Sequence, residues 1–175
     1  MPTTLNMPPP VSMPEVDGET FRKVMRRPAS TVTLIASRWG EDQAGITATA
    51  VCSLSDSPPS ILVCINKNSY ILDVIRRSNA FSVNFLLSEQ SDVAEIFAGK
   101  TPLKGKDRFL EEQWTLSEMG LPVLTNCLFS LDCTVDTISY KYSHSIVVGN
   151  IKIIHQNDRS SPLMYADGSF KSLSA

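Results

Sequence analysis

Short runs of β-branched and apolar residues, each bounded by turn residues, limit this chain to a fold built mainly from strands. Residues 31–38 are rich in Thr, Leu, Val and Ile and end at the turn sequence Trp-Gly-Glu-Asp, which predicts a strand followed by a hairpin turn. Residues 45–55 alternate small apolar residues with mostly hydroxylic ones, which predicts one strand with two different faces. Residues 60–66 follow a Pro-Pro break and are almost all apolar, which predicts a strand buried on both faces.

Further strands and two short helices complete the predicted domain. Strands are expected over residues 80–87, 127–138 and 145–155. Asn68 or Ser69 can cap a helix that runs to about Arg77, and Ser91 can cap a second helix that stops at Gly99. The result is a predominantly β domain, and strands at this spacing favour a barrel over a doubly wound parallel sheet.

The amino-terminal segment differs in composition from the rest of the chain. Its first twenty residues hold five of the eleven prolines and show almost no periodic apolar pattern. We therefore expect a proline-rich tail over residues 1–20 and a single domain over residues 21–175, a size suited to one hydrophobic core. The tail is either disordered or extended across a neighbouring subunit, and both remain open at this stage.

Charge and hydropathy exclude several classes of protein. The chain carries 16 Lys and Arg against 18 Asp and Glu, for a net charge of −2, so we expect no nucleic-acid partner. Its apolar runs are far shorter than the roughly 20 residues of a membrane-spanning helix, so we expect no membrane partner. The start of the chain shows no basic segment followed by an apolar one, as a secretory signal would, which predicts a cytoplasmic location.

Motifs for metal binding and for several common chemistries are absent from the sequence. Four cysteines occur without a C-x-x-C pair, and there are two histidines, so buried free thiols are favoured over a metal site. There is no G-x-G-x-x-G after a strand and no G-x-S-x-G elbow. His155, close to the end of a predicted strand, is expected at the surface.

One constellation could bind a planar ligand: the strand over residues 45–55 and the turn over residues 66–69. A flat polar heterocycle needs a wall of small residues, a row of hydrogen-bond donors along its edge and a cation for any phosphate. Gly45, Ala48 and Ala50 are small, and hydroxyl residues alternate with them. The same alternation also arises where one sheet face meets solvent, so the pattern alone leaves both interpretations open.

Several sequence blocks in order resemble the flavin reductase family, the small reductase components of two-component flavin monooxygenases such as those that hydroxylate 4-hydroxyphenylacetate. The blocks are residues 27–32, 45–55, 58–66, 80–86, 97–99, 107–109 and 162–165. The resemblance implies a six-stranded, Greek-key-like split β-barrel with short flanking helices that forms a homodimer. It further implies that the protein binds FMN or FAD and takes a hydride from NADH or NADPH.

The resemblance also implies a set of site residues. His144 is the catalytic candidate and would orient the nicotinamide by hydrogen bonding, because hydride transfer requires no acid at the nicotinamide. The family pattern Gly-Asp-His is changed here, since Tyr142 and Ser143 precede the histidine. The implied cofactor-binding residues are Thr47, Ala48, Thr49, Ala50, Val51, Cys52, Ser53, Asn66, Lys67, Asn68, Ser69, Phe85, Lys106 and Arg108.

Three functional hypotheses follow from these observations. In the first, the protein is an NAD(P)H:flavin oxidoreductase that supplies reduced flavin to a partner monooxygenase. In the second, an enzyme on the same barrel keeps FMN tightly bound and reduces another acceptor, such as a corrinoid or a metal chelate. In the third, the chain is a non-catalytic dimer that binds flavin or haem.

Overall fold

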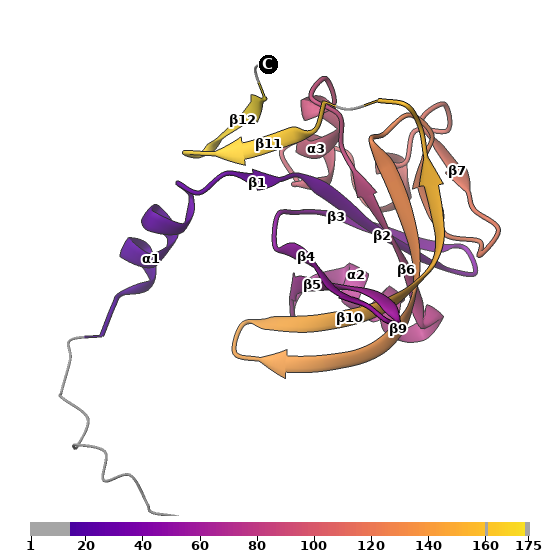
Figure 1. Cartoon of the computed structure of the whole chain (residues 1–175), viewed down its shortest axis with the longest axis horizontal. Coiled ribbons are helices and arrows are strands. Elements are labelled where there is room, and N and C mark those ends of the chain that lie inside the picture. Colours follow the sequence, from indigo (N-terminus) through magenta and orange to yellow (C-terminus); the bar gives the residue numbers. More distant parts are fainter. Residues whose placement is uncertain (1–14, 160, 174–175) are drawn as a thin grey trace, which may run out of the picture.

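A seven-stranded antiparallel sheet forms the centre of the computed structural model, which describes residues 15–159 and 161–173 (Figure 1). The sequence predicts six strands, and the count is wrong because the strand expected over residues 45–55 is two strands. Across the sheet the order is β3 (Asp42–Ala48), β2 (Thr33–Trp39), β6 (Ala80–Phe85), β9 (Phe129–Lys141), β10 (His144–Gln156), β5 (Pro59–Asn66) and β4 (Val51–Asp56).

The sheet curls strongly because its two edge strands are consecutive in the chain. Only Thr49 and Ala50 join the end of β3 to the start of β4, so the opposite edges must approach each other at this point. The carbonyl of Ala50 accepts a hydrogen bond of 2.9 Å from the amide of Cys64 on β5. Register shifts between β9 and β10, at Val148/Gly149 and Ile151/Ile153, add to the twist that such a curl requires.

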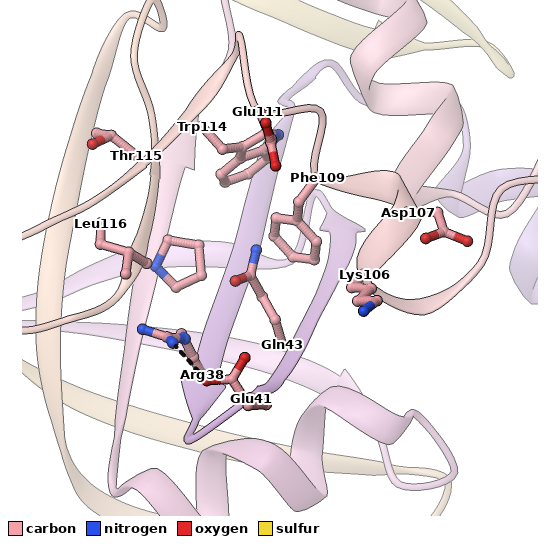
Figure 2. A pocket seen from close by; sticks show the side chains of 11 residues that line it. Arg38, Glu41, Gln43, Lys106, Asp107, Phe109, Glu111, Trp114, Thr115 and Leu116 are labelled. Carbon is pink, nitrogen blue, oxygen red and sulfur yellow. Dashed lines mark ion pairs between the residues drawn. The ribbon is translucent and has the colours of Figure 1, made fainter.

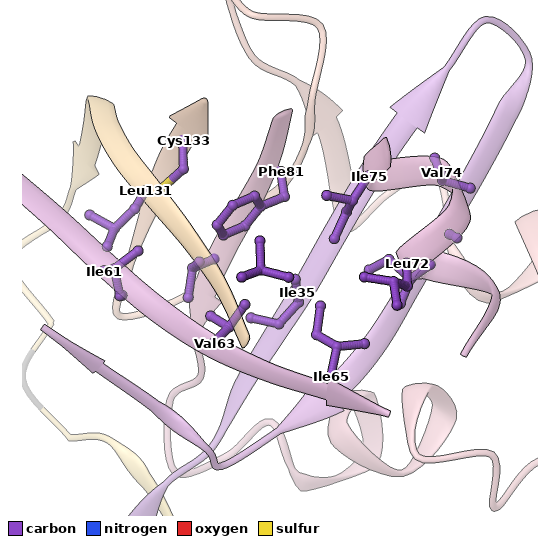
Figure 3. Packing of buried hydrophobic residues seen from close by; sticks show 14 residues of the cluster. Ile35, Ile61, Val63, Ile65, Leu72, Val74, Ile75, Phe81, Leu131 and Cys133 are labelled. Atoms are coloured by element: carbon purple, nitrogen blue, oxygen red, sulfur yellow. The ribbon is translucent and has the colours of Figure 1, made fainter. Parts of the chain in front are cut away.

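The concave side of the sheet holds the first hydrophobic core (Figure 3). Helix α2 (Tyr70–Ser78) covers it with a buried apolar face, as the spacing of Ile71, Leu72 and Ile75 predicts. Ser69 occupies the N-cap position, as expected, and Arg76 and Arg77 lie in the last turn, where they complement the helix dipole. The helix closes one side of the core and brings the Ser69 end towards β3.

A second core lies on the other face of β2. Helix α3 (Ser91–Phe97), the 3-10 turn η1 (Gly105–Arg108) and the hairpin of β7 (Trp114–Leu116) and β8 (Pro122–Leu124) cover this face. Ser91 is the first helical residue of α3 and Gln90 takes the cap position, one residue before the prediction. The rings of Phe97, Phe109 and Trp114 pack with centroids 4.9 to 5.3 Å apart. These aromatic contacts join α3 to the loop that follows it.

Three short strands form a separate small sheet beside α3 (Figure 1). They are β1 (Ser30–Thr31), β11 (Leu163–Ala166) and β12 (Ser169–Ser172), with β11 in the middle. Leu163 is buried in the second core, whereas β12 is mostly exposed. The carboxyl-terminal hairpin therefore rests on the outer layer of the domain.

Helix α1 (Gly18–Met25) projects away from the rest of the domain (Figure 1). Asp17 caps it by accepting hydrogen bonds of 2.9 Å from the amides of Glu19 and Thr20. No residue of this helix is buried. The helix crosses the boundary predicted between tail and domain, and most of the predicted tail lies outside the described residues. Among the helices that the structure describes, none has the length and apolar character needed to cross a membrane.

Candidate functional site

A cavity of about 590 Å³, called here the β3 cavity, is the candidate site. It is formed by β3, the start of α2, the end of α3 and the loop that contains η1. Thr47 and Ser69, which the sequence predicts in the site, both line it, together with Tyr70. Its size falls within the range of about 300 to 1,000 Å³ that is usual for small-molecule sites.

The charged side chains that line the β3 cavity are both positive. Among the described residues that line it, Lys104 and Arg108 carry a charge and none carries a carboxylate. The Nε of Arg108 donates a hydrogen bond of 3.1 Å to the carbonyl of Leu103, which fixes the guanidinium group on its loop. Cations without a competing carboxylate favour a ligand that bears phosphate.

A neighbouring cavity of about 510 Å³ shares Gln43 with the β3 cavity and has mixed charge (Figure 2). Phe109 and Trp114 form part of its wall. Arg38 lies 3.6 Å from the carboxylate of Glu41, the ion pair drawn in Figure 2. Its charged lining residues are two cations, Arg38 and Lys106, and three carboxylates, Glu41, Asp107 and Glu111. Because carboxylates predominate there, this second cavity suits an anion less well than the β3 cavity does.

Asp42 ties the two walls of the β3 cavity together. Its Oδ1 accepts a hydrogen bond of 2.9 Å from the hydroxyl of Tyr70 on α2, and its Oδ2 lies 2.8 Å from Nη1 of Arg77. The hydrogen bond from Arg77, followed by that from Tyr70, lowers the pKa of Asp42. The interactions of Asp42 with Tyr70 and Arg77 are therefore fully formed above the ordinary pKa of an aspartate. They are lost as the pH falls through the lowered pKa of Asp42.

The turn over residues 66–69 and the predicted catalytic histidine meet at one end of the sheet. His144 is paired with Asn66 across β10 and β5, and the amide of Lys67 donates to the carbonyl of Ser143 at 3.1 Å. The Oδ1 of Asn66 accepts a hydrogen bond of 3.0 Å from the amide of Asn68, which stabilises the turn. The His144 Nδ1 and the Ser143 hydroxyl are 2.9 Å apart. His144 is exposed, and Ser69 connects its turn to the β3 cavity.

The continuous strand predicted over residues 45–55 is wrong. The chain leaves β3 at Ala48 and enters β4 at Val51, on the opposite edge of the sheet. An alternating pattern indicates which face of the sheet each side chain points to. It does not indicate where the chain leaves one neighbouring strand and begins to pair with another. The predicted residues therefore do not share one cavity. Thr47 lines the β3 cavity, and it also lines a smaller cavity beside it together with Ala48 and Thr49. The remaining predicted residues of this segment lie outside both cavities: Ala50, Val51, Cys52 and Ser53.

Gly45 is small for a different reason from the one that the sequence pattern indicates. A Cβ atom at this position would lie 2.7 Å from Cε1 of Phe97 and 3.2 Å from Cζ of Phe109. The absence of a side chain therefore makes room for two aromatic rings of the protein's own core. The ring of Phe97 therefore occupies the space beside Gly45 in which the sequence pattern predicted a bound heterocycle.

Two other predicted residues lie away from the β3 cavity. Lys106 lines the neighbouring cavity of mixed charge. Phe85 stacks on Phe129, with ring centroids 4.3 Å apart, and packs against the first core. Arg108, from the same loop as Lys106, does line the β3 cavity.

Several residues that line the β3 cavity were not predicted in the site, among them Tyr70, Gln43 and Lys104. Tyr70 follows the predicted helix cap and Gln43 follows the hairpin turn, and neither position carries a signal in one sequence. Lys104 belongs to a visibly basic loop, so its charge was a usable signal, but only the fold shows that it faces Ser69 and Thr47 across one cavity. No group of three or more His, Cys, Asp or Glu side chains in the described part of the chain is arranged to hold a metal ion.

Comparisons with known proteins agree with this architecture. The family described as "Flavin reductase like domain" matches residues 25–174. The chain is similar to "FMN reductase (NADH) RutF 2" of Rhizobium rhizogenes, with 36% identity over 154 residues, covering 88% of each chain. It is also similar to "FMN reductase (NADH) RutF" of Serratia proteamaculans, with 34% identity over 170 residues, covering 97% of this chain and 96% of the relative.

Solved structures show the same relationship. The bacterial protein BorF, "the Flavin Reductase Component of a Bacterial Two-Component Tryptophan Halogenase", superposes with a TM-score of 0.84 at 26% identity. The match covers 91% of this chain and 99% of BorF. A family match over most of the domain, together with relatives above 30% identity along nearly the whole length, establishes that this chain belongs to the flavin reductase family.

Proposed function

We propose that this protein transfers a hydride from NADH to FMN or FAD and releases the reduced flavin to a separate monooxygenase. The observation that carries the proposal is the β3 cavity, whose charged lining residues, Lys104 and Arg108, are both cations. A flavin nucleotide is an aromatic ring system joined to phosphate, which matches a cavity that has both apolar and cationic walls. The names of the relatives, FMN reductase (NADH), support the choice of substrates.

Each part of the site has a role in this proposal. Lys104, Arg108 and the Ser69 end of α2 bind the flavin phosphate, and Thr47 lies along the ring. A bound flavin accepts the hydride of a nicotinamide placed against its open face. His144 donates a hydrogen bond that orients the nicotinamide, helped by the Ser143 hydroxyl 2.9 Å from its Nδ1. Lys67, Asn68 and Asn66 hold the turn that brings this histidine near the cavity.

The assembly that we propose is a homodimer of split β-barrels in the cytoplasm. The two-residue connection between the edge strands β3 and β4 supports closure of the curled sheet into a barrel. The exposure of β4 on a single chain supports a second copy as its cover. All four cysteines are free, which agrees with a reducing compartment. BorF is the flavin reductase component of a two-component tryptophan halogenase, which supports a separate partner enzyme that uses the reduced flavin.

The experiment that tests the function combines the purified protein with each flavin and each nicotinamide in turn. We expect a protein that is colourless after dialysis and oxidises NADH only when FMN or FAD is added. A stoichiometric yellow colour that survives dialysis would instead support tightly bound FMN and another electron acceptor. Failure to oxidise any nicotinamide with any flavin would overturn the proposal.

Charge removal in the β3 cavity tests where the phosphate binds. We expect Arg108→Gln and Lys104→Gln each to raise the KM for FMN about tenfold, since a hydrogen bond to a charged group contributes about 1.5 to 3 kcal/mol. The matched control is Lys152→Gln, an exposed cation on β10.

Riboflavin, which lacks the phosphate, makes this test specific. Steady-state kinetics with riboflavin should show nearly the same KM for the two cavity variants as for the wild type. Equal losses with FMN and riboflavin would show a general disturbance of the cavity and would contradict phosphate binding by these side chains.

A further inference from the structure

A smaller cavity of about 240 Å³, called here the β11–β12 cavity, adjoins the β3 cavity. It lies between the end of β3, the end of α3 and the carboxyl-terminal hairpin (Figure 1). Thr47 and Ala98 line both cavities, so the two are continuous over these residues. Its volume is below the range of about 300 to 1,000 Å³ that holds a whole drug-sized ligand, and it therefore suits a single ring system.

Two aromatic rings form the wall that the hairpin contributes. Tyr165 and Phe170 are cross-strand partners on β11 and β12, and their ring centroids are 5.7 Å apart at an interplanar angle of 69°. Both side chains are only partly buried and line the β11–β12 cavity. Val32 and Ala98 add apolar surface. Partly exposed aromatic rings in a concave site are well suited to stacking against a flat heterocycle.

A lysine side chain also lines the β11–β12 cavity. Lys100 lines it, and the Nζ atom lies 5.4 Å from the centroid of the Phe170 ring. The ammonium group also hydrogen-bonds to Oε1 of Glu95 at 3.1 Å, which holds it near the rim. From Lys100 the basic loop continues to Lys104 and Arg108 at the β3 cavity. Each of the two cavities therefore has at least one lysine or arginine side chain in its lining.

We propose that the β11–β12 cavity binds the adenosine phosphate half of a dinucleotide, an inference that rests on the proposed flavin reductase function. The adenine stacks on Phe170 and Tyr165, and the phosphate next to the adenosine lies at Lys100. A ligand with two ring systems joined by phosphates occupies both cavities, whereas FMN occupies only one. The adenosine phosphate half occurs in both FAD and NADH, and the kinetics below distinguish these two sources.

The test removes the aromatic face while retaining apolar bulk. In Phe170→Leu we expect a rise of about tenfold in the KM for the dinucleotide that uses the cavity, because stacking of a base on an aromatic side chain contributes about 1 to 3 kcal/mol. The kcat should stay nearly unchanged, since the contact is the same in the ground state and the transition state. Phe170→Tyr should restore the KM, and Leu173→Ala, an exposed apolar position on the same terminal segment, is the control.

Four substrates identify the source of the adenosine phosphate half. A raised KM for FAD with an unchanged KM for FMN assigns the cavity to FAD. A raised KM for NADH with an unchanged KM for reduced nicotinamide mononucleotide assigns it to NADH. An unchanged KM for both dinucleotides overturns the inference, even if FMN reduction is intact and the proposed function stands. Absence of FMN reduction in the wild type would instead overturn the proposed function.

Adenosine monophosphate provides a second measurement that needs no variant. We expect it to inhibit the wild-type enzyme competitively against the dinucleotide that uses the cavity and to leave FMN reduction with reduced nicotinamide mononucleotide unaffected. If Phe170→Leu does not fold, this inhibition still decides the question. Lack of inhibition against both dinucleotides would contradict an adenosine phosphate site.

Discussion

At the scale of single residues, Gly149 shows how a small position in this chain serves packing. An added Cβ would lie 2.5 Å from Cζ of Phe81 and 2.9 Å from Cβ of Cys133, two fully buried side chains. We expect Gly149→Ala to destabilise the fold by about 1 to 3 kcal/mol through overpacking. Thermal unfolding measures this, with Gly18→Ala as the control, because a Cβ at Gly18 meets only the flexible end of Arg22 at 3.3 Å. Equal midpoints for the two variants would contradict this packing.

Asp132 and His155 form a pair that the sequence did not reveal. His155 was expected at the surface, but its side chain is only 35% exposed and its Nε2 lies 3.4 Å from Oδ2 of the fully buried Asp132. Neither carboxylate oxygen has a hydrogen-bond partner in the described part of the chain. A buried carboxylate needs a compensating partner, and the imidazole of His155 is the group that the fold places beside it. The pair depends on the irregular register of β9 and β10, which no pattern in one strand specifies.

At the scale of elements, the parts that the sequence predicted well are those with a local cause. Helix α2 could be predicted because its cap, its apolar face and its basic last turn lie within ten residues. Strand β5 could be predicted from its apolar run after Pro58-Pro59. The division of β3 from β4 could not, because it depends on which edge of the sheet each half joins. For the same reason Thr47 lines the β3 cavity, whereas Cys52 and Ser53, which the alternating pattern puts on the same strand, lie on β4 at the other edge of the sheet.

The burial of Cys133 on β9 leads to a prediction about the reactivity of its thiol. Burial, followed by the charge of Asp132, raises the pKa of the Cys133 thiol to about 12. At about pH 8 only on the order of one molecule in ten thousand then carries the reactive thiolate at this position. We expect iodoacetamide to leave Cys133 unmodified in the folded protein and to modify it after denaturation, as peptide mass mapping would show. Rapid modification of Cys133 in the folded state would contradict its burial on β9.

At the scale of the whole molecule, three separate elements each carry exposed apolar side chains. These elements are α1, β4 and the hairpin between β9 and β10, with the exposed residues Phe21, Val24, Met25, Leu54, Tyr140 and Tyr142. A helix of eight residues is too short to be stable in water without packing partners. Apolar surface of this extent on a chain with only 19% charged residues supports the proposed homodimer, which the sequence alone implied only through family resemblance.

Placing a charge on β4 tests this assembly. Leu54 is 51% exposed, so Leu54→Asp leaves the fold of one chain intact and places an unpaired carboxylate in the proposed contact between copies. We expect light scattering after size exclusion to give the mass of two chains for the wild type and of one chain for the variant. Ile154→Asp on β10, where the isoleucine is 52% exposed, is the matched control and should remain a dimer. Alkylation of Cys52, exposed on the same strand, should become faster in Leu54→Asp. A variant that keeps the mass of two chains would show that the copies meet elsewhere, because a carboxylate buried in the contact would weaken it.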